Sequence, residues 1–217
     1  MRVLLFSGMA GDSRLYRPVR VPGYKIETPD HIEPRAGESL SAYAERVAEH
    51  HGVGADDVIG GASFGGMLVA QIAAARRVKG LILLSTTLSP RSLPRSYRVL
   101  EALGPAIPDA VLLLRSWLPL LELRFAPLTP EAAAALRAMA YAFPPSFIRR
   151  FGRMVMTWPG VAKPACPTLV VHGAKDRMIP ISCAEPDVVL DDAGHVFTLT
   201  HPEKTAEALA HFLRRIC

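Results

Sequence analysis

The sequence has few cysteines and no pattern that would make them structural. Its three cysteines, Cys166, Cys183 and Cys217, form no CxxC pair, and their number is odd. A framework of disulfides is therefore not expected, and cysteine usage of this kind favours a reducing compartment. We expect a cytoplasmic protein that uses no metal ion and no other cofactor.

Long apolar runs and dense runs of charge are also lacking. The most apolar region, Leu103–Leu123, is interrupted by Pro105, Pro108, Arg115 and Pro119. A membrane helix needs roughly 18 uninterrupted apolar residues, so we expect no membrane span. The formal net charge is +5, but no run of Lys or Arg marks a nucleic-acid surface, so we expect no nucleic-acid partner.

What the chain does contain is enough apolar material for one sizeable core. It has 217 residues, of which 50% are hydrophobic, and this suits one domain or one domain with a modest insertion. Short apolar runs alternate with helical patterns. The expected strands are Val3–Phe6, Tyr24–Glu27, Asp57–Ile59, Leu81–Ser85, Thr168–His172 and Val188–Leu190. The expected helices among them are Leu40–His50, Met67–Ala75 and Pro202–Ile216.

This alternation predicts βαβ units and an α/β fold with a parallel sheet. One segment, residues 89–159, breaks the rhythm, because it suggests several helices and no clear strand. Thr129-Pro130-Glu131 is a good signal for the start of one of these helices. We expect residues 1–88 and 160–217 to form the core and residues 89–159 to form a helical lid.

One short motif carries most of the chemistry. Residues 58–66 are V-I-G-G-A-S-F-G-G, with Ser63 between Gly61 and Gly65. A Walker-type phosphate loop would need lysine after the second glycine, and the glycine spacing of a dinucleotide fingerprint is also absent. A plain turn between strand and helix is the simplest alternative. The pattern G-x-S-x-G between a strand and a helix instead fits a nucleophilic serine on a sharp turn.

A serine nucleophile needs a base and an acid that orients it, in the chain order Ser, Asp or Glu, His. Asp176 follows the expected strand Thr168–His172, and His195 lies on a glycine loop before the last helix. Asp191 or Asp192 could replace Asp176 as the acid. We expect His172 to lie inside the strand end. The remaining histidines are expected at a helix start (His201) or on the surface (His31, His50, His51 and His211).

The loop after the first strand is expected to stabilise the oxyanion of an acyl-transfer reaction. Two backbone N–H donors are needed, and we expect them at Phe64, directly after the serine, and at Met9. Gly8 and Gly11 give this loop the freedom to turn an amide inward. Asp12 is expected to cap the short helix that follows rather than to take part in chemistry.

Together these segments resemble the α/β-hydrolase superfamily over nearly the whole chain. The resemblance rests on S-G-M, G-A-S-F-G-G, H-G-A-K-D-R-M-I-P and A-G-H-V-F-T-L-T-H-P-E-K, and the last two resemble small lid-bearing esterases such as the pimeloyl carrier-protein methyl ester esterases. It implies Ser63 as nucleophile, His195 as base and Asp176 as acid. The family usually has His-Gly where this chain has Ser7-Gly8. Because the chain begins at what would be the family's third strand, we expect a mostly or wholly parallel sheet of about six strands.

The resemblance implies hydrolysis of a small carboxylic ester through an acyl-enzyme, with a lid that shapes the substrate pocket. Trp117, Phe125, Met139 and Phe143 are the pocket candidates. The alternatives are a thioesterase acting on coenzyme A or an acidic acyl carrier, a carbon–carbon bond hydrolase or lyase, and a ligand receptor without catalysis. An acidic carrier would meet the arginines of the lid, but we favour a solvated helical face as their explanation. These arginines are Arg91, Arg95, Arg98, Arg115, Arg124, Arg137, Arg149, Arg150 and Arg153.

Overall fold

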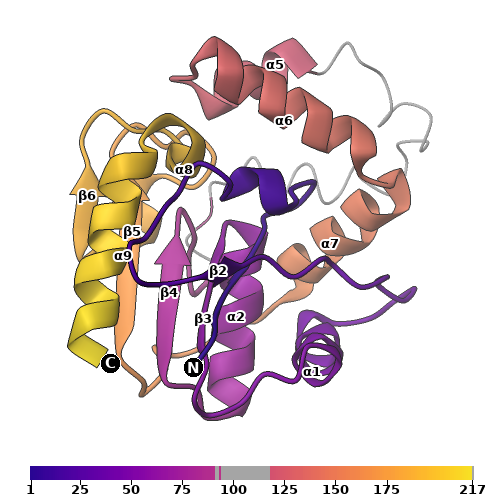
Figure 1. Ribbon diagram of the computed structural model, residues 1–217. Helices are drawn as coiled ribbons and strands as arrows, with labels where there is room; N and C mark the ends of the chain where they lie inside the picture. Colours follow the sequence, from indigo (N-terminus) through magenta and orange to yellow (C-terminus); the bar gives the residue numbers. More distant parts are fainter. Residues whose placement is uncertain (91–92, 94–117, 217) are drawn as a thin grey trace.

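The computed structural model describes residues 1–90, 93 and 118–216 (Figure 1). Six strands form one sheet in the order β2-β1-β3-β4-β5-β6, and every neighbouring pair is parallel. The expectation of about six parallel strands is confirmed. The strands are β1 (Val3–Phe6), β2 (Ile26–Glu27), β3 (Val58–Ala62), β4 (Gly80–Leu84), β5 (Thr168–Gly173) and β6 (Val188–Leu190).

The sheet is covered on both faces, which explains why its central strands read as continuous apolar runs. Every residue of β1, β3 and β4 is buried. The edge strand β2 is shorter than the expected strand Tyr24–Glu27, because only two of its residues pair with β1. The segment that follows β2 packs against the apolar cluster through Ile32.

Helices pack on each face through a separate apolar cluster. The helices are α1 (Leu40–His50), α2 (Phe64–Ala75), α5 (Leu118–Phe125), α6 (Pro130–Ala142), α7 (Pro145–Thr157), α8 (Phe197–Thr200) and α9 (Pro202–Ile216), with 3-10 turns η1 (Ser13–Leu15) and η5 (Ile181–Cys183). One cluster joins α1, α2 and α7 to the sheet, and the other joins α9 to the opposite face. Within the described ranges, no helix is long and apolar enough to cross a membrane.

Between β4 and β5 the described part of the chain contains only helices, as expected. We call α5, α6 and α7 the helical insertion. Thr129 caps α6 by accepting a hydrogen bond from Ala132 N at 3.2 Å. Helices α5 and α6 lie over one edge of the sheet, whereas α7 returns beside α1 and α2 (Figure 1). The insertion therefore covers the carboxyl ends of the strands, where ligands bind in open α/β sheets.

The first turn of α2 lies unusually close to the end of β1. A Cβ atom added at Gly65 would lie 2.2 Å from the carbonyl oxygen of Phe6 and 2.4 Å from that of Ser7. One added at Gly61 would lie 2.4 Å from the carbonyl carbon of Gly65. Only glycine fits at these positions, because the atoms it would meet belong to the backbone and cannot rotate away.

This packing predicts that even a methyl side chain at Gly65 lowers the stability of the fold substantially. We expect Gly65→Ala to lower the free energy of unfolding by about 1–3 kcal/mol, because the added methyl group forces α2 away from β1. Gly152→Ala in α7 is the matched control, since a Cβ there meets nothing within 4 Å. Its expected effect is a gain of about 0.5–1 kcal/mol, because alanine favours helix interiors. Denaturant unfolding measures both, and equal midpoints for Gly65→Ala and wild type would contradict the packing account.

Candidate active site

Ser63 stands at the junction of β3 and α2 in a conformation that non-glycine residues rarely adopt. Its φ is +54° and its ψ is −119°. Such backbone strain costs on the order of 1–3 kcal/mol, and it persists only where surrounding structure enforces it. Here Ser63 N donates to Leu84 O at 2.9 Å, and Thr86 Oγ1 donates to Ser63 O at 2.7 Å. The Ser63 side chain makes no helix-capping hydrogen bond, so its hydroxyl is left for another use.

Asp176 and His195 come together from the ends of β5 and β6. The distance between His195 Nδ1 and Asp176 Oδ2 is 2.7 Å, and both residues are buried. The other carboxylate oxygen, Oδ1, accepts from the N–H groups of Met178 at 2.8 Å and Ile179 at 2.9 Å. Both oxygens of Asp176 therefore have donors, as a buried carboxylate requires.

The surroundings of Asp176 favour its ionised form. Burial alone would raise the pKa of its carboxyl group. The charge of His195 and hydrogen bonds from His172, His195 and Ile179 outweigh burial and hold the pKa of Asp176 well below its usual range. Because an ionised carboxylate only accepts hydrogen bonds, His195 Nδ1 carries a proton toward Asp176. In the uncharged form of the ring, the lone pair is then on Nε2.

His172 supports the same acid from inside β5, where it was expected. Its Nε2–H donates to Ile179 O at 2.8 Å and lies 3.4 Å from Asp176 Oδ2. A carbonyl oxygen can only accept, so this contact assigns the proton to Nε2. The ring thus fixes the turn 176–179 that supplies the backbone donors to Asp176.

The alternative acids lie elsewhere. Asp192 is exposed and pairs with Lys175 at 2.9 Å, and Asp191 is exposed as well. In the described ranges no hydrogen bond joins Ser63 Oγ to His195. Such bonds are often long in ligand-free active sites, so the residues remain candidates for one site at the carboxyl edge of the sheet.

The loop after β1 runs beside Ser63. A Cβ added at Gly8 would lie 3.3 Å from Ser63 Cβ. The loop closes on itself through Gly11 N, which donates to Gly8 O at 3.0 Å, and through Ser7 Oγ, which donates to Gly11 O at 2.8 Å. Asp12 caps η1 by accepting from Arg14 N at 2.9 Å, as expected.

Two N–H groups, those of Phe64 and Met9, are the candidate anion donors. Helix α2 begins at Phe64, three residues earlier than the expected start at Met67, so the Phe64 N–H lies at a helix N-terminus. The expected second donor, Met9, lies in the loop after β1. Among the residues that the structure describes, no acceptor is found for the N–H of either Met9 or Phe64.

His31 is a functional candidate that was expected on the surface, and that expectation is wrong. The residue is partly buried, and its ring lies among Phe64, Phe143 and Phe151, with centroid distances of 5.8, 6.0 and 5.0 Å. Its Nε2 lies 3.2 Å from Ser7 Oγ. The only signal in the sequence was its position after a strand, and β2 is too short to make that signal visible.

The four pocket candidates have different surroundings. Trp117 lies outside the described residues. Phe125 lies against His195, with 5.6 Å between ring centroids, and Phe143 lies against His31. Met139 is buried in the cluster on the α9 face, so it holds the insertion to the body.

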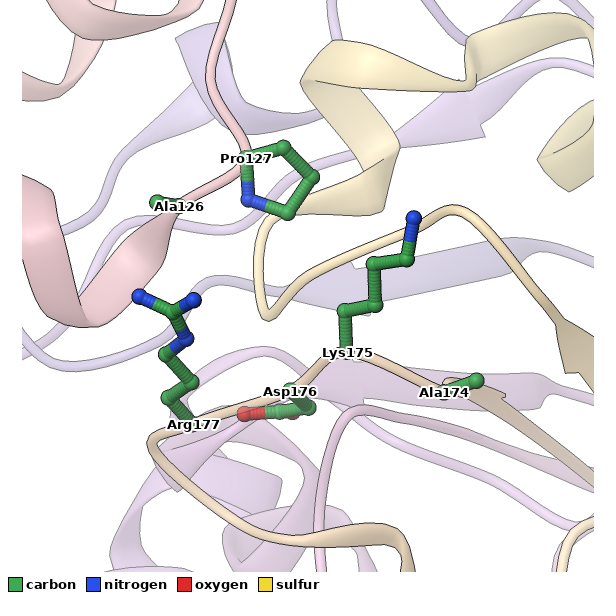
Figure 2. A pocket seen from close by; sticks show the side chains of 6 residues that line it. All are labelled: Ala126, Pro127, Ala174, Lys175, Asp176 and Arg177. Carbon is green, nitrogen blue, oxygen red and sulfur yellow. The ribbon is translucent and has the colours of Figure 1, made fainter.

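An open cavity of about 400 Å³ lies between the insertion and the loop that carries Asp176. Lys175 and Arg177 reach across it toward Pro127 and Ala126 (Figure 2). The Asp176 side chain itself is fully buried and is bonded to His195. The cavity therefore borders the outer side of the acid loop.

Comparisons with known proteins agree with the fold. No curated protein matches the sequence. An esterase from Thermogutta terrifontis is similar in fold at 24% identity and a TM-score of 0.76, over 100% of this chain and 90% of its own. A bromoperoxidase from Bacillus anthracis is 15% identical with a TM-score of 0.74, over 98% of this chain and 92% of its own. A meta-cleavage product hydrolase from Pseudomonas fluorescens is 16% identical with a TM-score of 0.71, over 100% of this chain and 92% of its own.

At these identities the likeness concerns the fold, and the three proteins differ in the reactions their names describe. The family model is more specific, because the model described as "Alpha/beta hydrolase family" matches residues 3–208. That range includes β1 with its loop, the strained serine and the Asp176–His195 pair. The chain belongs to the alpha/beta hydrolase family.

Proposed function

We propose that the protein is a serine hydrolase that cleaves a carboxylic ester through an acyl-enzyme on Ser63. The observation that carries this proposal is the strained conformation of Ser63, which is enforced by its neighbours and serves no capping role. Strain that has no structural use is typical of functional positions. The Asp176–His195 pair supports the proposal, since it supplies a base of the required tautomer.

The reaction begins when Ser63 Oγ attacks the carbonyl carbon of the ester. His195 Nε2 takes the hydroxyl proton as the new C–O bond forms, and the carbonyl electron pair moves onto its oxygen. Asp176 stabilises the imidazolium and holds its orientation through Nδ1. The proton then passes from His195 to the departing alcohol, whose C–O bond breaks to leave the acyl-enzyme. In the second half of the reaction, His195 Nε2 takes a proton from water as the water oxygen attacks the acyl carbon. The bond to Ser63 Oγ then breaks, Ser63 regains the proton from His195, and the carboxylic acid is released.

An oxyanion forms during both acylation and deacylation. We propose that it accepts hydrogen bonds from Met9 N–H and Phe64 N–H. Removal of one such donor typically costs about 10²- to 10³-fold in kcat. The positive end of the α2 dipole favours negative charge at the same place.

We further propose that the helical insertion, within residues 89–159, acts as a lid over a core formed by residues 1–88 and 160–217. Two contacts support this division: Phe125 packs on His195, and a Cβ added at Gly194 would lie 2.9 Å from Phe125 O. An apolar acyl or aryl group facing Phe125 and Phe143 would suit such a lid, as in the carrier-protein methyl ester esterases that the sequence resembles.

A free ester is favoured over an acyl carrier because two lid arginines, Arg137 and Arg150, already have partners. Arg137 pairs with Glu122 at 2.6 Å, and Arg150 donates to Pro34 O at 2.5 Å. Arg91, Arg95, Arg98 and Arg115 lie outside the described residues.

Substitution of the nucleophile tests the proposal directly. Ser63→Ala is expected to abolish turnover of a short p-nitrophenyl ester and labelling by a fluorophosphonate probe, because no attacking oxygen remains. Ser85→Ala is the matched control, since Ser85 also follows a strand with positive φ and its buried hydroxyl has no partner within the described residues. It should keep wild-type activity. A wild-type protein that resists the probe would favour the receptor without catalysis.

The acid is tested by removing its charge without changing its shape. Asp176→Asn is expected to reduce kcat by about 10²- to 10⁴-fold, because an amide can donate to His195 Nδ1 and select the wrong tautomer. Asp192→Asn removes a carboxylate that is closer in sequence to His195 than Asp176 is, and it should cost less than about twofold in kcat, since Asp192 is exposed. The reverse ranking would identify Asp192 as the acid.

The substrate class is tested by salt dependence. For a free ester, kcat/KM is expected to change by less than about twofold between low and moderate ionic strength, because no phosphate or acidic surface is recognised. The comparison uses a p-nitrophenyl ester, an acyl-carrier thioester and a carbon–carbon diketone substrate. Faster, strongly salt-sensitive turnover of the carrier thioester would overturn the ester proposal in favour of a thioesterase, and diketone cleavage alone would favour the carbon–carbon hydrolase.

A further inference from the structure

We infer that His31 is a positioning residue for the loop Ser7–Gly11, which it holds in the shape that aims the Met9 N–H at the developing oxyanion. This inference rests on the proposed function. It assigns to His31 a role in the reaction although the residue lies 24 positions after Ser7 in the sequence.

The hydrogen bonds between His31 and the loop have a defined direction. Gly11 O can only accept, so the Ser7 hydroxyl donates its single proton there, at 2.8 Å. Ser7 Oγ must then accept from His31, whose Nε2 lies 3.2 Å away and therefore carries the proton. The chain of bonds runs from His31 through Ser7 to Gly11 and spans the whole loop.

The same ring lies close to the carbonyl group that decides where Met9 N–H points. Burial lowers the pKa of His31 to about 4, and the carbonyls of Gly8 and Ser7 near the ring oppose that shift. The Gly8–Met9 peptide is trans, so the Gly8 C=O and the Met9 N–H point in opposite directions. With Gly8 O facing His31 and Gly11 N, the Met9 N–H is turned away from both.

The segment directly after His31 is held from several sides, which a positioning residue requires. Tyr43 Oη donates to Ile32 O at 3.0 Å, and Arg46 Nη2 donates to Glu33 O at 2.9 Å. Both come from α1, while Arg150 from α7 donates to Pro34 O. The ring also packs beside Phe64, whose N–H is the other proposed oxyanion donor.

Stability alone does not account for this histidine. Its Nδ1 is buried, and within the described residues it has no hydrogen-bond partner. Burying an unsatisfied polar atom costs about 1–3 kcal/mol, and an aromatic or aliphatic side chain among three phenylalanines would avoid that cost. What an apolar side chain could not provide here is the hydrogen bond from Nε2–H to Ser7 Oγ.

The test compares kcat and KM for His31→Leu, His31→Gln, Ser7→Ala and the double variant His31→Leu with Ser7→Ala. His31→Leu is expected to lower kcat by about 10- to 100-fold with KM changed less than about threefold, because a loosened donor acts on the transition state. His31→Gln, which can still donate to Ser7 Oγ, should recover most of the activity. The double variant should be no slower than the slower single variant, since both break one chain of bonds.

His51→Leu is the matched control, because His51 holds the same segment through Asp30 O at 3.2 Å without touching the loop. It should leave kcat within about twofold of wild type. Thermal unfolding of every variant separates loss of fold from loss of positioning, and Ser7→Ala keeps the test available if His31→Leu unfolds.

Equal kcat for wild type, His31→Leu and Ser7→Ala, with Ser63→Ala inactive, would overturn this inference and leave the hydrolase intact. An effect of His31→Leu that His31→Gln fails to recover would also overturn it. Wild-type turnover indistinguishable from Ser63→Ala would instead overturn the proposed function.

Discussion

The close approach of α2 to the end of β1 is the constraint on which the rest of the site depends. Gly65 allows the first turn of the helix to lie against the carbonyls of Phe6 and Ser7. That contact forces Ser63 into its strained turn, because strand and helix must reverse direction over one residue. It also sets the loop after β1 beside the helix N-terminus. One packing contact thus brings together the proposed nucleophile and both proposed oxyanion donors.

The buried charge of the candidate site, the carboxylate of Asp176, lies at the ends of β5 and β6 rather than beside β1. A buried carboxylate is costly unless donors surround it, and Asp176 has donors from two backbone N–H groups and two imidazole rings. These contacts keep Asp176 ionised, which fixes the tautomer of His195. Two further histidines contact backbone turns of the candidate site: His172 bonds to Ile179 O, and His31 lies beside Ser7 Oγ.

Local rules were enough to predict part of the candidate site. Asp176, His195 and the G-x-S-x-G turn were predicted because each follows a strand, and parallel strands bring their carboxyl ends to one edge. The structure places Asp176 and His195 in contact, and their roles stay proposals. Helix α2 begins three residues earlier than expected, because close packing against β1 requires Gly65 in its first turn although glycine disfavours helices. His31 was missed because its contact with Ser7 is long-range and leaves no periodic pattern. The pocket depends on side chains of the insertion, and no spacing rule predicts how they pack.

The central claim is that Ser63 carries the acyl group during turnover. Rapid mixing with a p-nitrophenyl ester, followed by acid quenching and peptide mass analysis, tests it most directly. The account predicts a burst of nitrophenol close to one equivalent and an acyl group on the peptide that contains Ser63. Turnover with no acylated peptide, or an acyl group found on another residue such as Cys166, would contradict it.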